Sequence, residues 1–162
     1  MIKVGNKAPV FTLLNQDDEK TALKNFAGKW VVLYFYPRDN TSGCTKEAMD
    51  FTWLKRRMDR RDAVVIGVSP DSTESHRNFI KKYKLKVMLL SDPEKTVMQK
   101  YGAWGMKKMY GKEKEGVIRS TVLIGPDGRV AEIWSQVKVR VKRKDGEVKH
   151  AEKVLEKLDE LK

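Results

Sequence analysis

The residue best suited to chemistry in this chain is its single cysteine, Cys44. A thiolate is a strong nucleophile, whereas a buried thiol behaves as a small apolar side chain. Cys44 falls where an apolar run, ended by Pro37, gives way to a predicted helix, and it lies in the first turn of that helix. Unpaired backbone N–H groups and the helix dipole stabilise negative charge at this position. The sequence therefore favours a reactive thiolate over an inert core residue.

Two neighbours of the cysteine support this interpretation. Gly43 lets the backbone approach a ligand closely, and Thr41 can turn its hydroxyl toward the same point in space. With one cysteine there is no intramolecular disulfide, so the fold must be stable without one. The two histidines, His76 and His150, do not form a pair at ligand spacing, so we predict neither a metal site nor a cofactor.

The bulk composition sets the broad class. A length of 162 residues with 40% apolar side chains predicts one domain over residues 1–162. Neither a membrane span nor a signal segment is evident, so we expect a soluble, cytoplasmic protein. The 34 cationic and 22 anionic side chains leave a net charge of +12. Because the cations are spread along the whole chain, they favour a solvated, ion-pairing surface of the kind found in thermophiles over a nucleic-acid interface.

The elements that must position Cys44 alternate between strands and helices. Continuous apolar runs predict central strands at residues 31–36, 64–68 and 87–90. Runs at residues 120–124 and 129–134 flank Pro126-Asp127-Gly128 and predict an antiparallel hairpin, which makes the sheet mixed. Helices are predicted over residues 44–59, from a cap at Asp71 to about Tyr83, over residues 94–101 and over residues 150–161. The pattern is that of an α/β fold.

Several separated segments resemble the peroxiredoxins. The family pattern of Pro, three residues, Thr or Ser, two residues and Cys matches Pro37, Thr41 and Cys44. Further segments follow in the family's order at residues 5–13, 65–72, 90–93 and 116–121, so the resemblance covers nearly the whole chain. They look most like the bacterioferritin comigratory branch. The resemblance implies a thioredoxin-like (peroxiredoxin) fold, with a central mixed sheet flanked by helices.

The resemblance also implies an activity and roles for particular residues. The chain would be a thiol-dependent peroxidase for hydrogen peroxide and organic hydroperoxides, in which Cys44 attacks the peroxide and becomes a sulfenic acid. Thr41 would bond both the thiolate and the peroxide. Arg119 would stabilise the sulfur and the leaving oxygen, Glu47 would hold Arg119 in place, and Pro37 would shield the site from water. The N–H group of Gly43 would add a further donor.

Two positions depart from the family pattern. Many relatives carry a resolving cysteine five residues after the first, where this chain has Met49. The sulfenic acid would then need an external thiol, either of low molecular weight or on a thioredoxin-like or glutaredoxin-like protein, or a cysteine of a partner chain. Ser42 replaces a proline found in many members, which we expect to loosen the loop without removing a catalytic group. Members of this branch are commonly monomers; we expect a monomer here, with a dimer as the alternative.

The basic segment from Lys138 to Lys149 suggests a rival function. The run from Val137 to Lys142 alternates apolar and basic residues and predicts a strand that turns at Asp145-Gly146. A basic binding module on a thioredoxin-like scaffold is therefore the alternative. The segment has no nucleic-acid motif and no interleaved aromatic residues, so nucleic-acid binding is not favoured. A dithiol oxidoreductase is excluded because the chain has no Cys-x-x-Cys pair.

One further question stays open at the sequence level. Trp104, Met106 and Met109 precede Arg119 in a segment that we expect to be a glycine-rich loop. They could cover the active site or pack on the surface, and the sequence does not choose between these roles.

Overall fold

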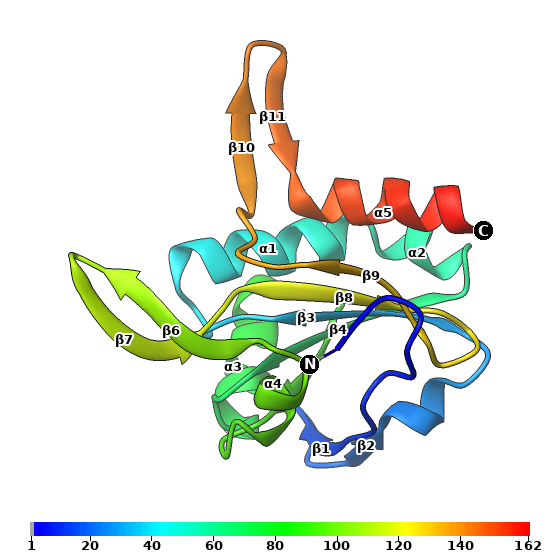
Figure 1. The fold of residues 1–162 in the computed structure, drawn as a ribbon, viewed down its shortest axis with the longest axis horizontal. Coiled ribbons are helices and arrows are strands. Elements are labelled where there is room, and N and C mark those ends of the chain that lie inside the picture. Colours follow the sequence, from blue (N-terminus) through cyan, green and yellow to red (C-terminus); the bar gives the residue numbers. More distant parts are fainter. Residues whose placement is uncertain (1) are drawn as a thin grey trace.

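A seven-stranded sheet lies at the centre of the computed structural model, which describes residues 2–162 apart from the side chain of Met109 (Figure 1). The strand order is β2-β1-β5-β4-β3-β8-β9. Strands β3, β4 and β5 pair in parallel, and β8 and β9 continue the sheet in antiparallel pairing. The prediction of a mixed sheet is confirmed. The strands are β1 (Thr12–Asn15), β2 (Lys20–Ala22), β3 (Trp30–Phe35), β4 (Ala63–Ser69), β5 (Met88–Ser91), β8 (Ser120–Ile124) and β9 (Val130–Trp134).

Helices cover both faces of this sheet (Figure 1). The elements are the short 3-10 helix η1 (Leu23–Phe26) and the α-helices α1 (Ser42–Trp53), α2 (Lys55–Asp59), α3 (Thr73–Tyr83), α4 (Thr96–Lys100) and α5 (His150–Leu161). Alternate side chains of β3 enter two hydrophobic clusters, one shared with α1, α2 and α5 and the other shared with α4. Both faces of β3 are therefore buried, which explains its unbroken apolar run. In the part of the chain that is described, no helix has the length and apolarity needed to cross a membrane.

Three helix predictions need correction. The predicted helix over residues 44–59 is two helices, because the backbone at Leu54 leaves helical geometry with φ −91° and ψ 5°. Asp71 does not cap α3. Instead the Ser72 hydroxyl accepts from the Ser75 N–H, while the Asp71 carboxylate accepts the backbone N–H of Asp39. Helix α4 is shorter than predicted, since Lys95 before it has φ 61°.

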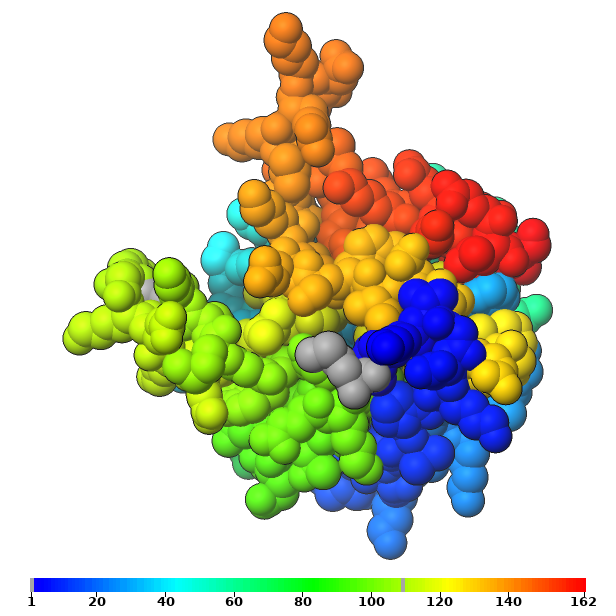
Figure 2. Space-filling view, viewed as in Figure 1, coloured from blue at the N-terminus to red at the C-terminus, as the bar shows by residue number. Residues whose placement is uncertain are grey.

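Two hairpins project from the body of the protein (Figures 1 and 2). In the first, β6 (Trp104–Met109) pairs with β7 (Lys112–Val117) through a turn in which Tyr110 and Gly111 both have positive φ, as a two-residue type I′ connection requires. This hairpin replaces the predicted glycine-rich loop. In the second, β10 (Arg140–Arg143) pairs with β11 (Gly146–Lys149), which confirms a strand and a turn in the basic segment. The turn residues are Lys144 and Asp145, one position earlier than predicted, because Gly146 already pairs with Arg143.

One glycine in the sheet makes room for an aromatic ring beneath α1. Gly67 of β4 pairs with Tyr34 of β3, and the Tyr34 ring stacks on Phe51 of α1 at 4.9 Å between ring centroids. A Cβ atom at Gly67 would lie 2.7 Å from Tyr34 Cζ and 2.8 Å from Leu89 Cδ2. Any side chain here would push the Tyr34 ring toward the helix that carries Cys44.

We predict that Gly67→Ala lowers the free energy of unfolding by about 1–3 kcal/mol, because the extra methyl group overpacks the core. Gly116→Ala is the matched control: its Cβ would also approach an atom to 2.7 Å, but that atom is Cε of the flexible Lys107 side chain. We expect a much smaller loss there. Urea denaturation of both variants measures the difference, and equal losses would contradict the packing argument.

Candidate active site

Cys44 lies in the first turn of α1, one residue after Gly43 and three after Thr41, which precedes the first helical residue. The sequence prediction for the position of the cysteine is confirmed. Its side chain is buried, with 1% of the residue exposed, and the Sγ atom lies 3.2 Å from Nη2 of Arg119. A guanidinium N–H can donate to a sulfur at this distance and stabilises its ionised form. The environment of the thiol is therefore enclosed and cationic.

Arg119 connects the cysteine to a buried carboxylate. It stands immediately before β8, and its Nη1 donates to Oε1 of Glu47 at 2.7 Å while Nη2 faces Cys44. Glu47 follows Cys44 by three residues, so both side chains lie on the same face of α1. The Arg119 carbonyl accepts the backbone N–H of Val137 at 2.9 Å. One planar guanidinium thus contacts both Cys44 and Glu47.

Burial changes the proton affinity of Glu47. It raises the pKa of this carboxyl from 4.5 to about 7, although the Arg119 charge acts in the opposite direction. Its second oxygen, Oε2, and the nearby hydroxyl of Tyr34 have no hydrogen-bond partner within the described part of the chain. Burial and the Glu47 charge raise the pKa of Tyr34 well above its ordinary value. The sequence did not single out Tyr34, since it lies inside an apolar strand run.

The other predicted site residues are Gly43, Thr41 and Pro37. A Cβ atom on Gly43 would lie 3.3 Å from Arg119 Nη2, so the glycine permits the close approach of the guanidinium. Thr41 is exposed, and its hydroxyl donates to the Arg38 carbonyl at 2.9 Å. That geometry does not bring the hydroxyl to the sulfur, and the bond between Thr41 and the thiolate stays a prediction. Pro37 lines the groove that leads to Arg119.

This groove has a volume of about 610 Å³ and separates the β6–β7 hairpin from the loop after β3. Met106 lines the groove, whereas Trp104 packs against a core cluster. The Lys95 Nζ atom lies 5.4 Å from the centroid of the Trp104 ring. The side chain of Met109 is outside the described residues. The residues that line the groove are Pro37, Met106, Lys107, Lys108, Glu113, Val117, Ile118, Arg119 and Gln136.

The chain is similar in sequence to known proteins along most of its length. The AhpC/TSA family model matches residues 4–133. The putative peroxiredoxin bcp of Helicobacter pylori is 45% identical over 157 residues, covering 97% of this chain and 98% of the relative. The peroxiredoxin Bcp of Bacillus subtilis is 45% identical over 139 residues, covering 86% and 88%.

Solved structures agree with the sequence comparison. A mutant PrxQ from Xylella fastidiosa superposes with a TM-score of 0.88 and 34% identity, covering 99% of this chain and 98% of that one. The bacterioferritin comigratory protein of Xanthomonas campestris superposes with a TM-score of 0.83 and 38% identity, covering 93% and 91%. The thioredoxin-like fold predicted from the resemblance is confirmed. The chain therefore belongs to the AhpC/TSA family, and within it to the Bcp (PrxQ) type of peroxiredoxin, here with a single cysteine.

Proposed function

We propose that this peroxiredoxin reduces hydrogen peroxide and organic hydroperoxides through Cys44, with a sulfenic acid as intermediate and an external thiol as reductant. The observation that carries the proposal is the Arg119 guanidinium, which reaches Cys44 Sγ with one nitrogen and the buried Glu47 carboxylate with the other. A structural cysteine would not need a partly buried cation held against its sulfur.

The proposed reaction is a nucleophilic substitution at a peroxide oxygen. The Cys44 thiolate attacks the terminal oxygen of the hydroperoxide, and the S–O bond forms as the O–O bond breaks. The sulfur is oxidised to a sulfenic acid, while the second oxygen leaves with the electron pair and takes up a proton to become water or an alcohol. Arg119 stabilises the negative charge on the sulfur before attack and on the leaving oxygen during it.

Ionisation of the thiol alone does not account for a fast peroxidase. A free thiol is a few per cent ionised at neutral pH, so complete ionisation gains roughly thirtyfold at most. The larger share must come from donors that are already aimed at the charge formed in the transition state. Arg119 and the N–H groups of Gly43 and Cys44 are the donors we assign. Thr41 joins them if its hydroxyl turns from the Arg38 carbonyl toward the sulfur.

The return to the thiol must use a second molecule. The chain has one cysteine, and the position five residues later is Met49, whose surface is 46% exposed. Reduction of the sulfenic acid therefore needs a low-molecular-weight thiol or a thioredoxin-like or glutaredoxin-like protein. Without such a thiol, further peroxide would oxidise Cys44 to a sulfinic acid.

The basic β10–β11 hairpin gives less support to a binding function. Two of its cations are already paired, since Arg140 donates to Asp50 of α1 at 2.7 and 3.1 Å and Lys149 lies 4.0 Å from the same carboxylate. These contacts tie the base of the hairpin to the helix that carries Cys44. The contacts of Arg119 with Cys44 and Glu47 support the peroxidase hypothesis more directly, and we retain that hypothesis.

The first test replaces the nucleophile. We expect Cys44→Ser to reduce hydrogen peroxide consumption in the presence of dithiothreitol to the uncatalysed background, because no other thiol exists in the chain. Met49→Leu is the control, since this exposed thioether could consume peroxide without catalysis. Peroxide consumption by the Cys44→Ser variant at the wild-type rate would rule out the proposed mechanism.

The second test breaks the bridge made by Arg119. We expect Arg119→Lys to lower the second-order rate constant of Cys44 with hydrogen peroxide about 100-fold, because a single ammonium does not reproduce the two-pronged fork. Arg140→Lys is the matched control, as Arg140 also binds a carboxylate of α1 with two nitrogens but away from Cys44. Stopped-flow kinetics should show less than about a twofold change for the control. Similar losses in both variants would argue against a direct role of Arg119.

The third test follows the ionisation of Glu47. Its pKa is raised from 4.5 to about 7 in the folded protein, so the folded state binds more protons than the unfolded state between these values. The contribution of Glu47 to stability should therefore fall as pH rises through this window, by up to about 3 kcal/mol. Glu47→Gln should lack this dependence. Urea denaturation at a series of pH values measures both slopes, and a wild-type contribution that rises with pH would show that the Arg119 charge outweighs burial.

A further inference from the structure

The loop that delivers Cys44 to α1 contains a buried acid. This loop spans residues 36–41, and its members Arg38, Asn40 and Thr41 are exposed. Asp39 lies among them with a side chain that is 3% exposed. Carboxylates are almost never buried to this degree unless they are paired. The peroxidase mechanism above does not use Asp39, so its burial needs a separate explanation.

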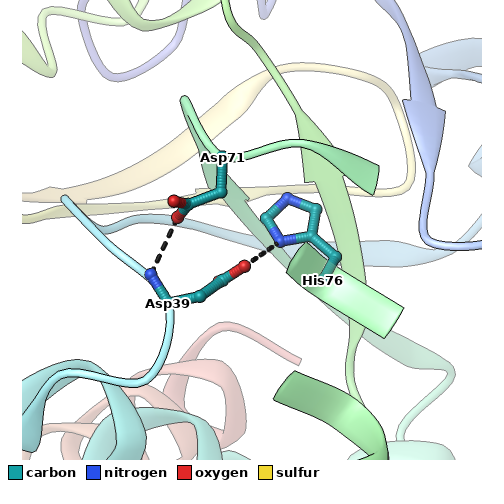
Figure 3. Close-up of side chains that lie close together, drawn as sticks. All are labelled: Asp39, Asp71 and His76. Atoms are coloured by element: carbon teal, nitrogen blue, oxygen red, sulfur yellow. Dashed lines mark hydrogen bonds and ion pairs between the residues drawn. The ribbon is translucent and has the colours of Figure 1, made fainter. Parts of the chain in front are cut away.

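Three side chains meet the Asp39 carboxylate. The Tyr36 hydroxyl donates to Oδ1 at 2.5 Å, and the Ser75 hydroxyl donates to Oδ2 at 2.8 Å. Nδ1 of His76 lies 2.7 Å from Oδ2 (Figure 3). Ser75 and His76 both belong to α3. The backbone N–H of Asp39 donates to Oδ2 of Asp71 at 2.7 Å. One residue of the loop is thus fixed by its side chain and by its backbone.

His76 links the loop to the sheet. Its Nε2 lies 2.9 Å from the Leu90 carbonyl of β5, which can only accept, so Nε2 donates this hydrogen bond. Its Nδ1 lies 2.7 Å from Oδ2 of Asp39. The fully buried ring therefore joins the loop to the sheet through two polar contacts. Loss of the Asp39 carboxylate would leave Nδ1 of this buried ring without its nearest partner, which is costly.

The same cluster also has the composition of a cation site. Asp39, Asp71 and His76 each place a ligand atom within 4.8 Å of the others. However, these atoms are engaged in hydrogen bonds: Oδ2 of Asp71 accepts both from the Asp39 N–H and from the Ser69 hydroxyl at 2.7 Å. Nε2 of His76 is bound to the Leu90 carbonyl. The cluster is therefore an anchor made of hydrogen bonds, and we do not assign a metal to it.

The anchor matters because the space around Cys44 is tight. Asp39 precedes Cys44 by five residues, and Nη2 of Arg119 lies 3.2 Å from Sγ. A Cβ atom on Gly43 would already lie within 3.3 Å of the guanidinium. A shift of about 1 Å in the start of α1 would therefore break the contact with the sulfur or create a clash, and misplacements of this size can cost about 100-fold in rate.

We propose that Asp39 and His76 are positioning residues that hold the β3–α1 loop, and with it Cys44, in register with Arg119. Their effect passes through the placement of the thiol, since within the described structure neither side chain forms a hydrogen bond or ion pair with Cys44 or Arg119. This inference rests on the proposed function of Cys44. It adds the requirement that the β3–α1 loop be held in place by residues outside the site.

The experiment separates placement from folding by using two reactions of the same thiol. We expect Asp39→Asn and His76→Phe each to lower the rate constant of Cys44 with hydrogen peroxide about tenfold or more. Alkylation by iodoacetamide, which does not use the Arg119 contact, should be unchanged or faster because a loosened loop exposes the buried sulfur. The double variant should fall no further than the worse single variant, as expected for residues that act together. Circular dichroism and urea denaturation establish that the variants are folded.

A gentler pair of variants keeps the proposal testable if these do not fold. Tyr36→Phe removes one donor from Asp39, and we expect a several-fold loss of peroxide reactivity. Tyr101→Phe is the matched control, because it removes an equally short hydrogen bond, 2.5 Å to the Pro9 carbonyl, away from the loop. The control should stay within about twofold of wild type.

Two results would overturn the proposal. One is a folded Asp39→Asn or His76→Phe variant, or Tyr36→Phe, that keeps the wild-type peroxide rate. The other is an equal loss of peroxide reactivity and of alkylation by iodoacetamide. That result would mean that the thiol has become inaccessible to both reagents rather than displaced from Arg119. Failure of the wild-type protein to consume peroxide would instead refute the proposed function, so the two failures are distinguishable.

Discussion

The contact between the Arg119 guanidinium and the first turn of α1 is the constraint on which the site depends. Arg119 is partly buried, and its charge would be costly there without the Glu47 carboxylate 2.7 Å away. Glu47 is in turn buried beneath the same helix, one turn after Cys44. The cation that lies against the sulfur is therefore held by the helix that carries the sulfur, and displacement of either group weakens this contact.

Packing beneath α1 sets the height of this helix above the sheet. Tyr34 of β3 stacks on Phe51 of α1, and the space for the Tyr34 ring exists because β4 has a glycine at the paired position. Further along the same helix, Asp50 binds Arg140 at the base of the β10–β11 hairpin. The basic segment thus has a structural role at its base, even though its tip extends from the body.

The sequence predicts those parts of the structure that depend on residues close together in the chain. The buried strands and α5 follow from apolar periodicity, and the position of Cys44 follows from the strand–helix junction. The contact of Arg119 with Glu47 joins residues 72 positions apart, so no local pattern predicts it, and it was reached through the family resemblance. The β6–β7 hairpin was missed because much of it is exposed, so its strands show no alternation of apolar and polar residues.

The Asp39–His76 pair was missed for a different physical reason. Each residue alone has the pattern of a surface position, an acid in a polar loop and a histidine near a helix start, and only their meeting across 37 residues makes both buried. Together with Glu47 and Arg119, this pair places one buried acid on each side of Cys44, five residues before it and three residues after it. A segment fixed at both ends over nine residues has little freedom to move its central thiol. On the proposal above, the reactivity of Cys44 depends on where the backbone is held as much as on which groups surround the sulfur. The same Cys44 and Arg119 side chains would react more slowly with peroxide if the β3–α1 loop were loose.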